Sequence, residues 1–149
     1  MGRRRQAHRY QTRLNAPRLN SKHSLAELTA LVARALENAG ASSAMAAATA
    51  RALVAAEAAG QGGHGLSRVT MYAEHVKNGR ADGKALPRIV HEKTSACLID
   101  AQGGLAYPAM ELAVAEALRR ARETGVAFCG VTNSHHCRSE EHTSELQSH

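Results

Sequence analysis

The segment Gly62–Arg68, with the sequence GGHGLSR, places a histidine between glycines and an arginine four residues later. Apolar residues recur at helical spacing from Leu66 onward, which predicts a turn that opens a helix. If that helix begins at about Gly65, His64 and Arg68 share one face, roughly 6 Å apart. Arginine can clamp a carboxylate and imidazole can donate a proton to a neighbouring carbonyl, so the pair suits reduction of a 2-oxo acid. The same spacing is common on solvated helix surfaces, so the pair alone leaves both interpretations open.

The composition indicates one globular, mostly helical domain. The chain has 149 residues, of which 44% are hydrophobic and only 3% aromatic, enough for one modest core. No run approaches the roughly 18 apolar residues of a membrane span, and we expect a cytoplasmic protein without a membrane partner. The three cysteines, Cys97, Cys129 and Cys137, lack the spacing of a disulfide framework or zinc ribbon, which favours reduced thiols.

The net charge of +6 comes almost entirely from one flank. Residues 1–23 hold seven lysines and arginines and no acidic residue, whereas residues 24–137 hold eleven basic and ten acidic side chains. We interpret residues 1–23 as a basic, disordered extension. One alternative function is a small basic module that binds nucleic acid through this extension, although the charge balance of the remainder does not favour such a partner.

Residues 24–79 predict a helical N-terminal segment. Ser24 and Glu27 have the spacing of a capping box, so the first helix should begin there. Its apolar stripe consists of Leu25, Leu28, Leu31, Val32, Ala35 and Leu36. The second helix, at residues 45–59, is almost entirely small and apolar, and should pack closely and antiparallel against the first. The third helix runs from Leu66 to the Asn78-Gly79 pair.

Residues 80–137 predict the beginning of an α/β domain. The run IVHEKTSACLID, residues 89–100, indicates a hairpin that turns at Lys93-Thr94. A helix should cover about residues 109–124, and the apolar run VAFCGV, residues 126–131, should form a buried central strand.

Polar residues follow that strand at its carboxyl end, where α/β sheets bind ligands. These residues are Asn133, Ser134, His135 and His136. Neighbouring side chains of an extended segment point to opposite sides, so His135 and His136 should not both face one site. A metal site that recruits Cys129 and Cys137 lacks a usual ligand spacing, and we predict no metal.

The last segment, RSEEHTSELQSH at residues 138–149, breaks the preceding pattern abruptly. Read back into codons, it matches a common sequencing-library adapter. We therefore predict that this tail is an artefact of assembly, and we assign no function to its histidines or acids.

Two motifs resemble those of the type-2 malate/L-lactate dehydrogenase family. GGHGLSRVTMY, residues 62–72, resembles the family signature Ser-His-Gly-x-x-Arg-x-x-x-Tyr, and GVTNSHHC, residues 130–137, resembles its Asn-x-x-His motif. The runs VKNGRADGKALP and LIDAQGGLAYPAM also occur in family order. Residues 24–137 are thus similar to the N-terminal third of these non-Rossmann oxidoreductases, which include sulfolactate and ureidoglycolate dehydrogenases.

The resemblance implies a fragment of an α/β enzyme that transfers a hydride between NAD or NADP and a small 2-hydroxy/2-oxo acid of the malate, lactate or sulfolactate type. It implies that His64 exchanges the hydroxyl proton, that Arg68 anchors the carboxylate and that Tyr72 lines the same face. The residues beside substrate and nicotinamide would be Asn133 and His136, with Ser134 and His135 next to them. Gly63 stands where the family usually has serine.

Family members have chains more than twice as long and form homodimers whose sites lie between domains and subunits. We therefore expect the 149-residue chain to be inactive by itself. A remaining alternative is an inactive helical interaction fragment, in which His64 and Arg68 are ordinary surface residues.

Overall fold

The first two helices begin at serine caps. In this computed structural model, which describes residues 22–135, helix α2 spans Leu25–Asn38 and helix α3 spans Ser43–Ala58. The Ser24 hydroxyl oxygen accepts a hydrogen bond from the Glu27 amide at 3.2 Å, and the Glu27 carboxylate accepts one from the Ser24 amide at 2.8 Å. The Ser42 hydroxyl accepts the Met45 amide at the start of α3. The predicted capping box at Ser24 is confirmed, because capping depends on residues only three apart.

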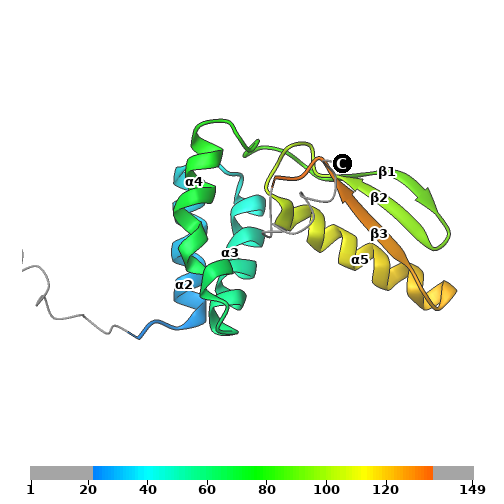
Figure 1. Cartoon of the computed structure of the whole chain (residues 1–149), viewed down its shortest axis with the longest axis horizontal. Coiled ribbons are helices and arrows are strands. Elements are labelled where there is room, and N and C mark those ends of the chain that lie inside the picture. The colour runs from blue at the N-terminus through cyan, green and yellow to red at the C-terminus, as the bar shows by residue number, and fades with distance from the viewer. Residues whose placement is uncertain (1–21, 136–149) are drawn as a thin grey trace, which may run out of the picture.

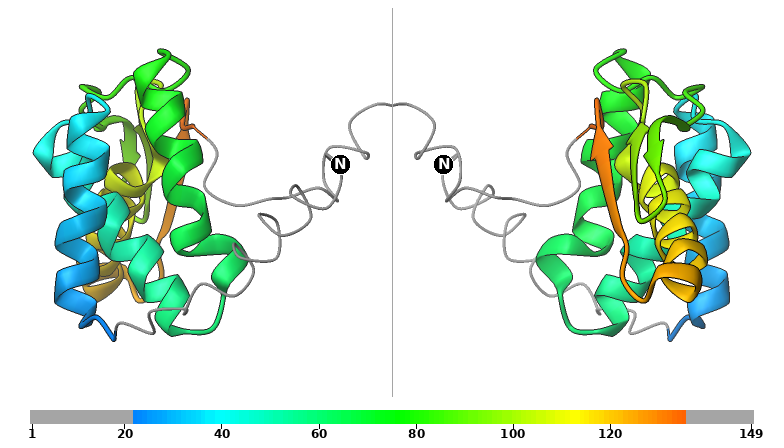
Figure 2. Two further views of the ribbon diagram at one scale, coloured as in Figure 1. Left: turned by 90° about the vertical axis from the view of Figure 1, so that its left-hand side faces the viewer. Right: turned by 90° about the vertical axis from the view of Figure 1, so that its right-hand side faces the viewer.

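Helices α2, α3 and α4 (Val69–Lys77) pack together as one helical layer and share a hydrophobic core (Figures 1 and 2). Leu36 and Leu53 are fully buried in it, and burying a leucine of this kind stabilises the fold by about 1.5–3 kcal/mol. Ala46 and Ala50 on α3 have no exposed surface, so the helix backbones approach closely, as the run of small residues predicted.

The sheet has three described strands in the order β1-β2-β3. Strands β1 (Arg88–Lys93) and β2 (Ala96–Asp100) form the predicted antiparallel hairpin, and β3 (Phe128–Thr132) lies parallel to β2. Helix α5 (Ala106–Thr124) connects β2 to β3 and packs on one face of the sheet (Figure 1). A second core lies between them, formed by Cys97, Ile99, Ala101, Ala109 and Ala113. The predicted α/β class is confirmed.

Helix α5 begins at Ala106, earlier than the predicted start near residue 109. Pro108 therefore occupies the first turn, where the absence of its N–H costs nothing because the first four amides of a helix have no intrahelical partner. The helix ends at Gly125, whose φ of 79° gives the left-handed conformation typical of a helix exit.

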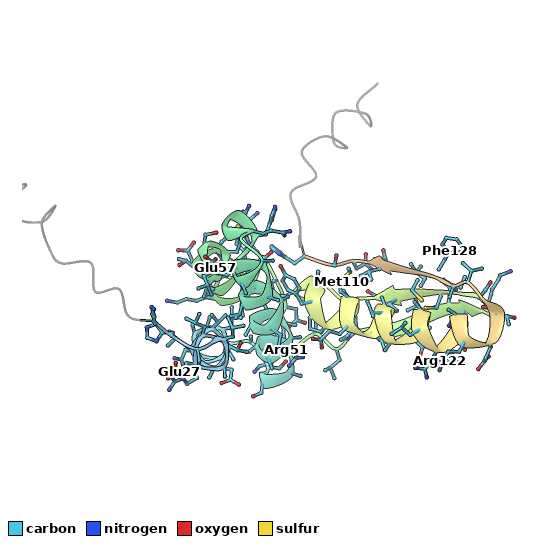
Figure 3. The ribbon with its side chains drawn as sticks, turned by 90° about the horizontal axis from the view of Figure 1, so that it is seen from below. Glu27, Arg51, Glu57, Met110, Arg122 and Phe128 are labelled. Atoms are coloured by element: carbon cyan, nitrogen blue, oxygen red, sulfur yellow. The ribbon has the colours of Figure 1, made fainter. Side chains whose placement is uncertain are left out.

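Strand β3 differs from the prediction of a buried central strand. Within residues 22–135 it lies at the edge of the sheet, and Phe128 is 72% exposed. Alternate residues Cys129 and Val131 pack toward α5, whereas Phe128 projects from the opposite side (Figure 3). The prediction is wrong for the described part of the chain, because no described element covers that face or pairs with the free edge.

Arg120, near the end of α5, connects this helix to the β1–β2 hairpin through hydrogen bonds. Its guanidinium is buried and donates to the Glu116 carboxylate at 3.2 Å, to the Glu92 carboxylate at 2.7 Å and to the Lys93 carbonyl. The neighbouring Arg119 pairs with Glu116 from an exposed position. No helix in the described ranges has the length and apolarity needed to cross a bilayer.

We predict that Arg120→Ala lowers the thermal unfolding midpoint by on the order of 10 °C, since it removes a buried guanidinium that is the shared donor to one carbonyl and two carboxylates. Arg119→Ala is the matched control and should shift the midpoint by only about 1–2 °C, because exposed ion pairs contribute little. Circular dichroism melting curves of both variants provide the measurement. Equal shifts would contradict the role given to Arg120.

Candidate active site

The GGHGLSR segment forms two separate single turns rather than the start of one helix. The 3-10 turn η1 spans Gly62–His64 and the 3-10 turn η2 spans Leu66–Arg68, directly before α4. Gly65 lies between them with φ −97° and ψ −134°, far from helical values. The condition that a helix starts by about Gly65 is therefore not met, and His64 and Arg68 do not share a helical face. The third helix predicted from Leu66 is found, with η2 as its first turn and α4 as its continuation.

The side chains of two residues after His64 donate hydrogen bonds to backbone carbonyls before it. The Ser67 hydroxyl donates to the Gly62 carbonyl at 2.6 Å, and the Arg68 Nε donates to the Gly63 carbonyl, also at 2.6 Å. On the opposite side, the carboxylate of Glu57 at the end of α3 accepts the Leu66 amide at 2.9 Å. The position of His64 thus depends on hydrogen bonds across the turn.

Of the two terminal nitrogens of the Arg68 guanidinium, Nη2 makes no hydrogen bond within residues 22–135, and Nη1 makes only a long one, to a sulfur atom. Its Nε is used by Gly63, and Nη1 lies 4.0 Å from the Met71 sulfur. None of the ion pairs among residues 22–135 involves Arg68. His64 is half-buried, and within the same residues its imidazole makes no hydrogen bond or ion pair. The pair can therefore offer a planar fork for an anion and a proton-exchanging ring.

The carboxyl ends of β2 and β3 lie side by side. Backbone hydrogen bonds continue past the strands, from the Gly103 amide to the Asn133 carbonyl at 2.7 Å and from the His135 amide to the Gly104 carbonyl at 2.8 Å. Asn133 has a φ of 50°, a left-handed conformation that asparagine tolerates better than most residues. Its side-chain amide donates to Asp100 at 3.1 Å.

Asp100 is held as a carboxylate by its neighbours. The Gln102 backbone amide, at 2.8 Å, and then the Asn133 side chain lower the pKa of Asp100 below its ordinary value. The more distant Arg88, 3.9 Å away, acts in the same direction. Asp100 was not singled out from the sequence, although its place at a strand's carboxyl end, before a glycine pair, is a usable signal.

His135 points toward α4 rather than toward open solvent. Its ring lies 4.7 Å from that of His75 and 6.1 Å, edge-on, from that of Tyr72. The Tyr72 hydroxyl lies 3.4 Å from the hydroxyl of Tyr107 on α5. Tyr72 is only 2% exposed, so in the described structure it is a core residue that connects the helical layer to the segment after β3.

Ser134 faces the other way and lines a groove of about 420 Å³ between α5 and β3, together with Met110 and Cys129. The alternation expected for an extended segment is thus observed at Ser134 and His135. His136 lies outside the described residues, and so does Cys137.

The predicted site residues fall into two groups. The structure brings Tyr72 to His135, and it joins Asn133 to Asp100. Within residues 22–135, no hydrogen bond or ion pair connects the side chains of His64 or Arg68 to Asn133–His135. The roles of these residues toward a substrate therefore stay predictions.

The cysteines form a pair on the α5 side of the sheet. Cys97 and Cys129 occupy matching positions on β2 and β3, with their sulfur atoms 2.9 Å apart. Burial is the main cause that raises the pKa of the Cys97 thiol to about 11, so this thiol stays protonated at neutral pH. Across the described ranges, no three His, Cys, Asp or Glu side chains converge in a way that could hold a metal ion.

We predict that Gly65→Ala disrupts the turn, since a Cβ at this position would lie 3.0 Å from the Glu57 Cα, which is tighter than nine in ten real Cβ contacts, and would overlap the Glu57 Oε2. The expected loss in unfolding free energy is about 1–3 kcal/mol, the usual cost of overpacking. Gly63→Ala is the matched control, because its Cβ would meet nothing within 4 Å. Denaturant titration of both variants tests this, and equal stability of the two would contradict it.

We also predict that acid loosens the end of the sheet. The pKa of Asp100 is lowered in the folded chain, so its contribution to stability is present above the ordinary carboxyl pKa and is lost as the pH falls through the folded value. The Gln102 amide and the Asn133 side-chain amide should shift together as the pH falls below about 4. Two-dimensional NMR resolves both signals, and in Asp100→Asn neither should titrate.

The chain resembles proteins of one oxidoreductase family in sequence and in structure. A family model described as malate/L-lactate dehydrogenase matches residues 23–145. This match extends into residues 138–149, so the adapter origin of that segment stays a prediction. Over 113 residues the chain is 39% identical to the (2R)-3-sulfolactate dehydrogenase (NADP(+)) of Chromohalobacter salexigens, covering 76% of this chain and 34% of that relative.

Other relatives agree with this match. Over 110 residues the chain is 32% identical to a Δ1-pyrroline-2-carboxylate/Δ1-piperideine-2-carboxylate reductase of Pseudomonas putida, covering 74% of this chain and 32% of the reductase. The sulfolactate dehydrogenase from Methanocaldococcus jannaschii superposes with a TM-score of 0.72 at 27% identity, covering 83% of this chain and 36% of that one. The chain thus spans about a third of the length of these relatives. Because the family model matches well over half of its residues, the chain belongs to the malate/L-lactate dehydrogenase family.

Proposed function

We propose that this chain supplies the substrate-handling part of an enzyme that transfers a hydride between NAD or NADP and a small 2-hydroxy/2-oxo acid. The observation that carries this proposal is the turn at Gly62–Arg68, which presents an imidazole together with an arginine. The terminal nitrogens of that arginine make only one long hydrogen bond, to the Met71 sulfur, among the described residues. Family membership supports the reaction class, because the relatives named above are dehydrogenases and a reductase.

In this proposal Arg68 binds the substrate carboxylate through its two terminal guanidinium nitrogens. His64 then exchanges the proton of the adjacent oxygen: the protonated imidazole donates to the carbonyl oxygen during reduction, and the neutral imidazole accepts the hydroxyl proton during oxidation. The hydrogen bond from Arg68 to the Gly63 carbonyl connects the carboxylate-binding side chain with the proton-exchanging one, because Gly63 directly precedes His64.

The substrate class follows from chemistry that the relatives share. Sulfolactate is a 2-hydroxy acid, and a Δ1-pyrroline-2-carboxylate carries its carboxylate on the carbon of a C=N bond. In both substrates a carboxylate is attached to the carbon that is reduced. One arginine side chain can bind this carboxylate in either substrate. We propose a malate, lactate or sulfolactate type of substrate for this protein.

The cofactor is proposed from the family, one relative of which is named for NADP(+). When bound, the nicotinamide accepts or supplies the hydride. Among the described residues, Asn133 and Ser134 stand at the carboxyl end of β3, the position where α/β sheets bind ligands, and the Ser134 hydroxyl borders the groove beside α5. We place these two residues and the adjoining His135 and His136 on the substrate and nicotinamide side of the site. No residue is assigned to the cofactor's phosphates.

A homodimeric assembly and a cytoplasmic location complete the proposal, and both rest on the family resemblance. The alternative of a nucleic-acid-binding module acting through residues 1–23 is not supported by the comparisons, which match oxidoreductases. Residues 1–21 of that extension lie outside the described part of the chain.

We predict that His64→Ala lowers the turnover of the protein encoded by the uninterrupted reading frame by at least about 100-fold, the usual contribution of general acid/base catalysis. NAD(P)H absorbance with malate, lactate and sulfolactate as substrates provides the measurement. His91→Ala is the control, since His91 is an exposed histidine on the hairpin, and it should keep wild-type turnover. The 149-residue chain is expected to show no steady-state turnover. Unchanged turnover in His64→Ala would remove this residue from the mechanism.

A further inference from the structure

We infer that Glu57 is a positioning residue for His64, an inference that rests on the proposed function. Glu57 lies on the last turn of α3 and is labelled in Figure 3. Its Oε2 accepts the Leu66 amide at 2.9 Å, across nine residues of sequence. The acceptor therefore comes from the helix before the turn and not from the turn itself.

The Leu66 amide is directed to this carboxylate because the backbone of Gly65 is not helical, and the carbonyls that a regular helix would offer have other donors. An α-helical bond from Leu66 would go to the Gly62 carbonyl, which accepts the Gly65 amide at 3.3 Å and the Ser67 hydroxyl at 2.6 Å. A 3-10 bond would go to the Gly63 carbonyl, which accepts the Arg68 Nε at 2.6 Å. The break at Gly65 thus redirects one amide to Glu57.

Glu57 also lies close to Gly62 and Gly65 of the turn. A Cβ on Gly62 would lie 3.7 Å from Glu57 Oε1, and a Cβ on Gly65 would lie 3.0 Å from the Glu57 Cα and Cβ. Gly62 and Gly65 flank His64 on both sides in the sequence. Glu57 therefore leaves little room for a side chain at Gly65 and lies near Gly62.

The hydrogen bonds within the turn and the hydrogen bond to Glu57 have different structural effects. Ser67 and Arg68 fix the internal shape of the turn, because each joins a residue after His64 to a residue before it. Glu57 fixes the turn to α3, which also packs against α5. Loss of the Glu57 acceptor would leave the turn closed but free to shift against the helices, and a shift of about 1 Å can cost up to 100-fold in rate.

The test compares Glu57→Met with Glu57→Gln, which have nearly the same volume but differ in having an oxygen acceptor. In the protein encoded by the uninterrupted reading frame, Glu57→Met should lower kcat by about 10- to 100-fold while KM stays within about threefold, because proton transfer is misaligned while Arg68 still binds the carboxylate. Glu57→Gln should restore most of the turnover. Glu37→Ala, at an exposed position on α2, should behave as wild type.

The hydrogen bond itself is measured by NMR on the 149-residue chain. The Leu66 amide should be protected from hydrogen exchange in the wild type and in Glu57→Gln, and it should lose that protection in Glu57→Met. A purely structural role would lower the unfolding midpoint of Glu57→Met without the kcat loss, which would overturn the inference. A Leu66 amide insensitive to Glu57 would overturn it as well. Should His64→Ala keep full turnover, the proposed function fails, whatever the Leu66 amide shows.

Discussion

The close packing of α3 is the constraint on which the rest of the structure depends. Small side chains on this helix allow α2 to approach on one side and α5 on another, while its last turn reaches the two turns around His64. The bidentate pair between Arg51 and Glu111 also joins α3 to α5, but both side chains are about half exposed, and such pairs contribute little. Apolar packing, and not that ion pair, sets the relation between the helical layer and the sheet.

Features of the fold that depend on neighbouring residues could be predicted from the sequence. The capping box at Ser24 and the hairpin of residues 89–100 need only local chemistry, and both are found. The hairpin turns at Thr94-Ser95, one residue later than predicted. The burial of β3 could not be predicted in the same way. An apolar run indicates a strand suited to a protein interior, but it does not say which element covers each face.

In the candidate site too, local features could be predicted from the sequence and non-local contacts could not. Residue types and spacing identified His64 and Arg68, but their relation in space comes from the Gly63 carbonyl and the Glu57 carboxylate, not from a helical repeat. A helical pattern cannot reveal an acceptor nine residues away. The contact of His135 with Tyr72 is equally non-local, because it joins α4 to the segment after β3.

The exposed edge of β3 bears on how this chain behaves in concentrated solution. No other strand of residues 22–135 pairs with this edge, so its backbone amides and carbonyls are a template for pairing with another extended chain, and Phe128 adds an apolar side chain that is 72% exposed. Beside it, α5 exposes the apolar row Met110, Val114 and Leu118. The net positive charge of the chain opposes such association, so the solubility of the chain should fall as salt screens that charge.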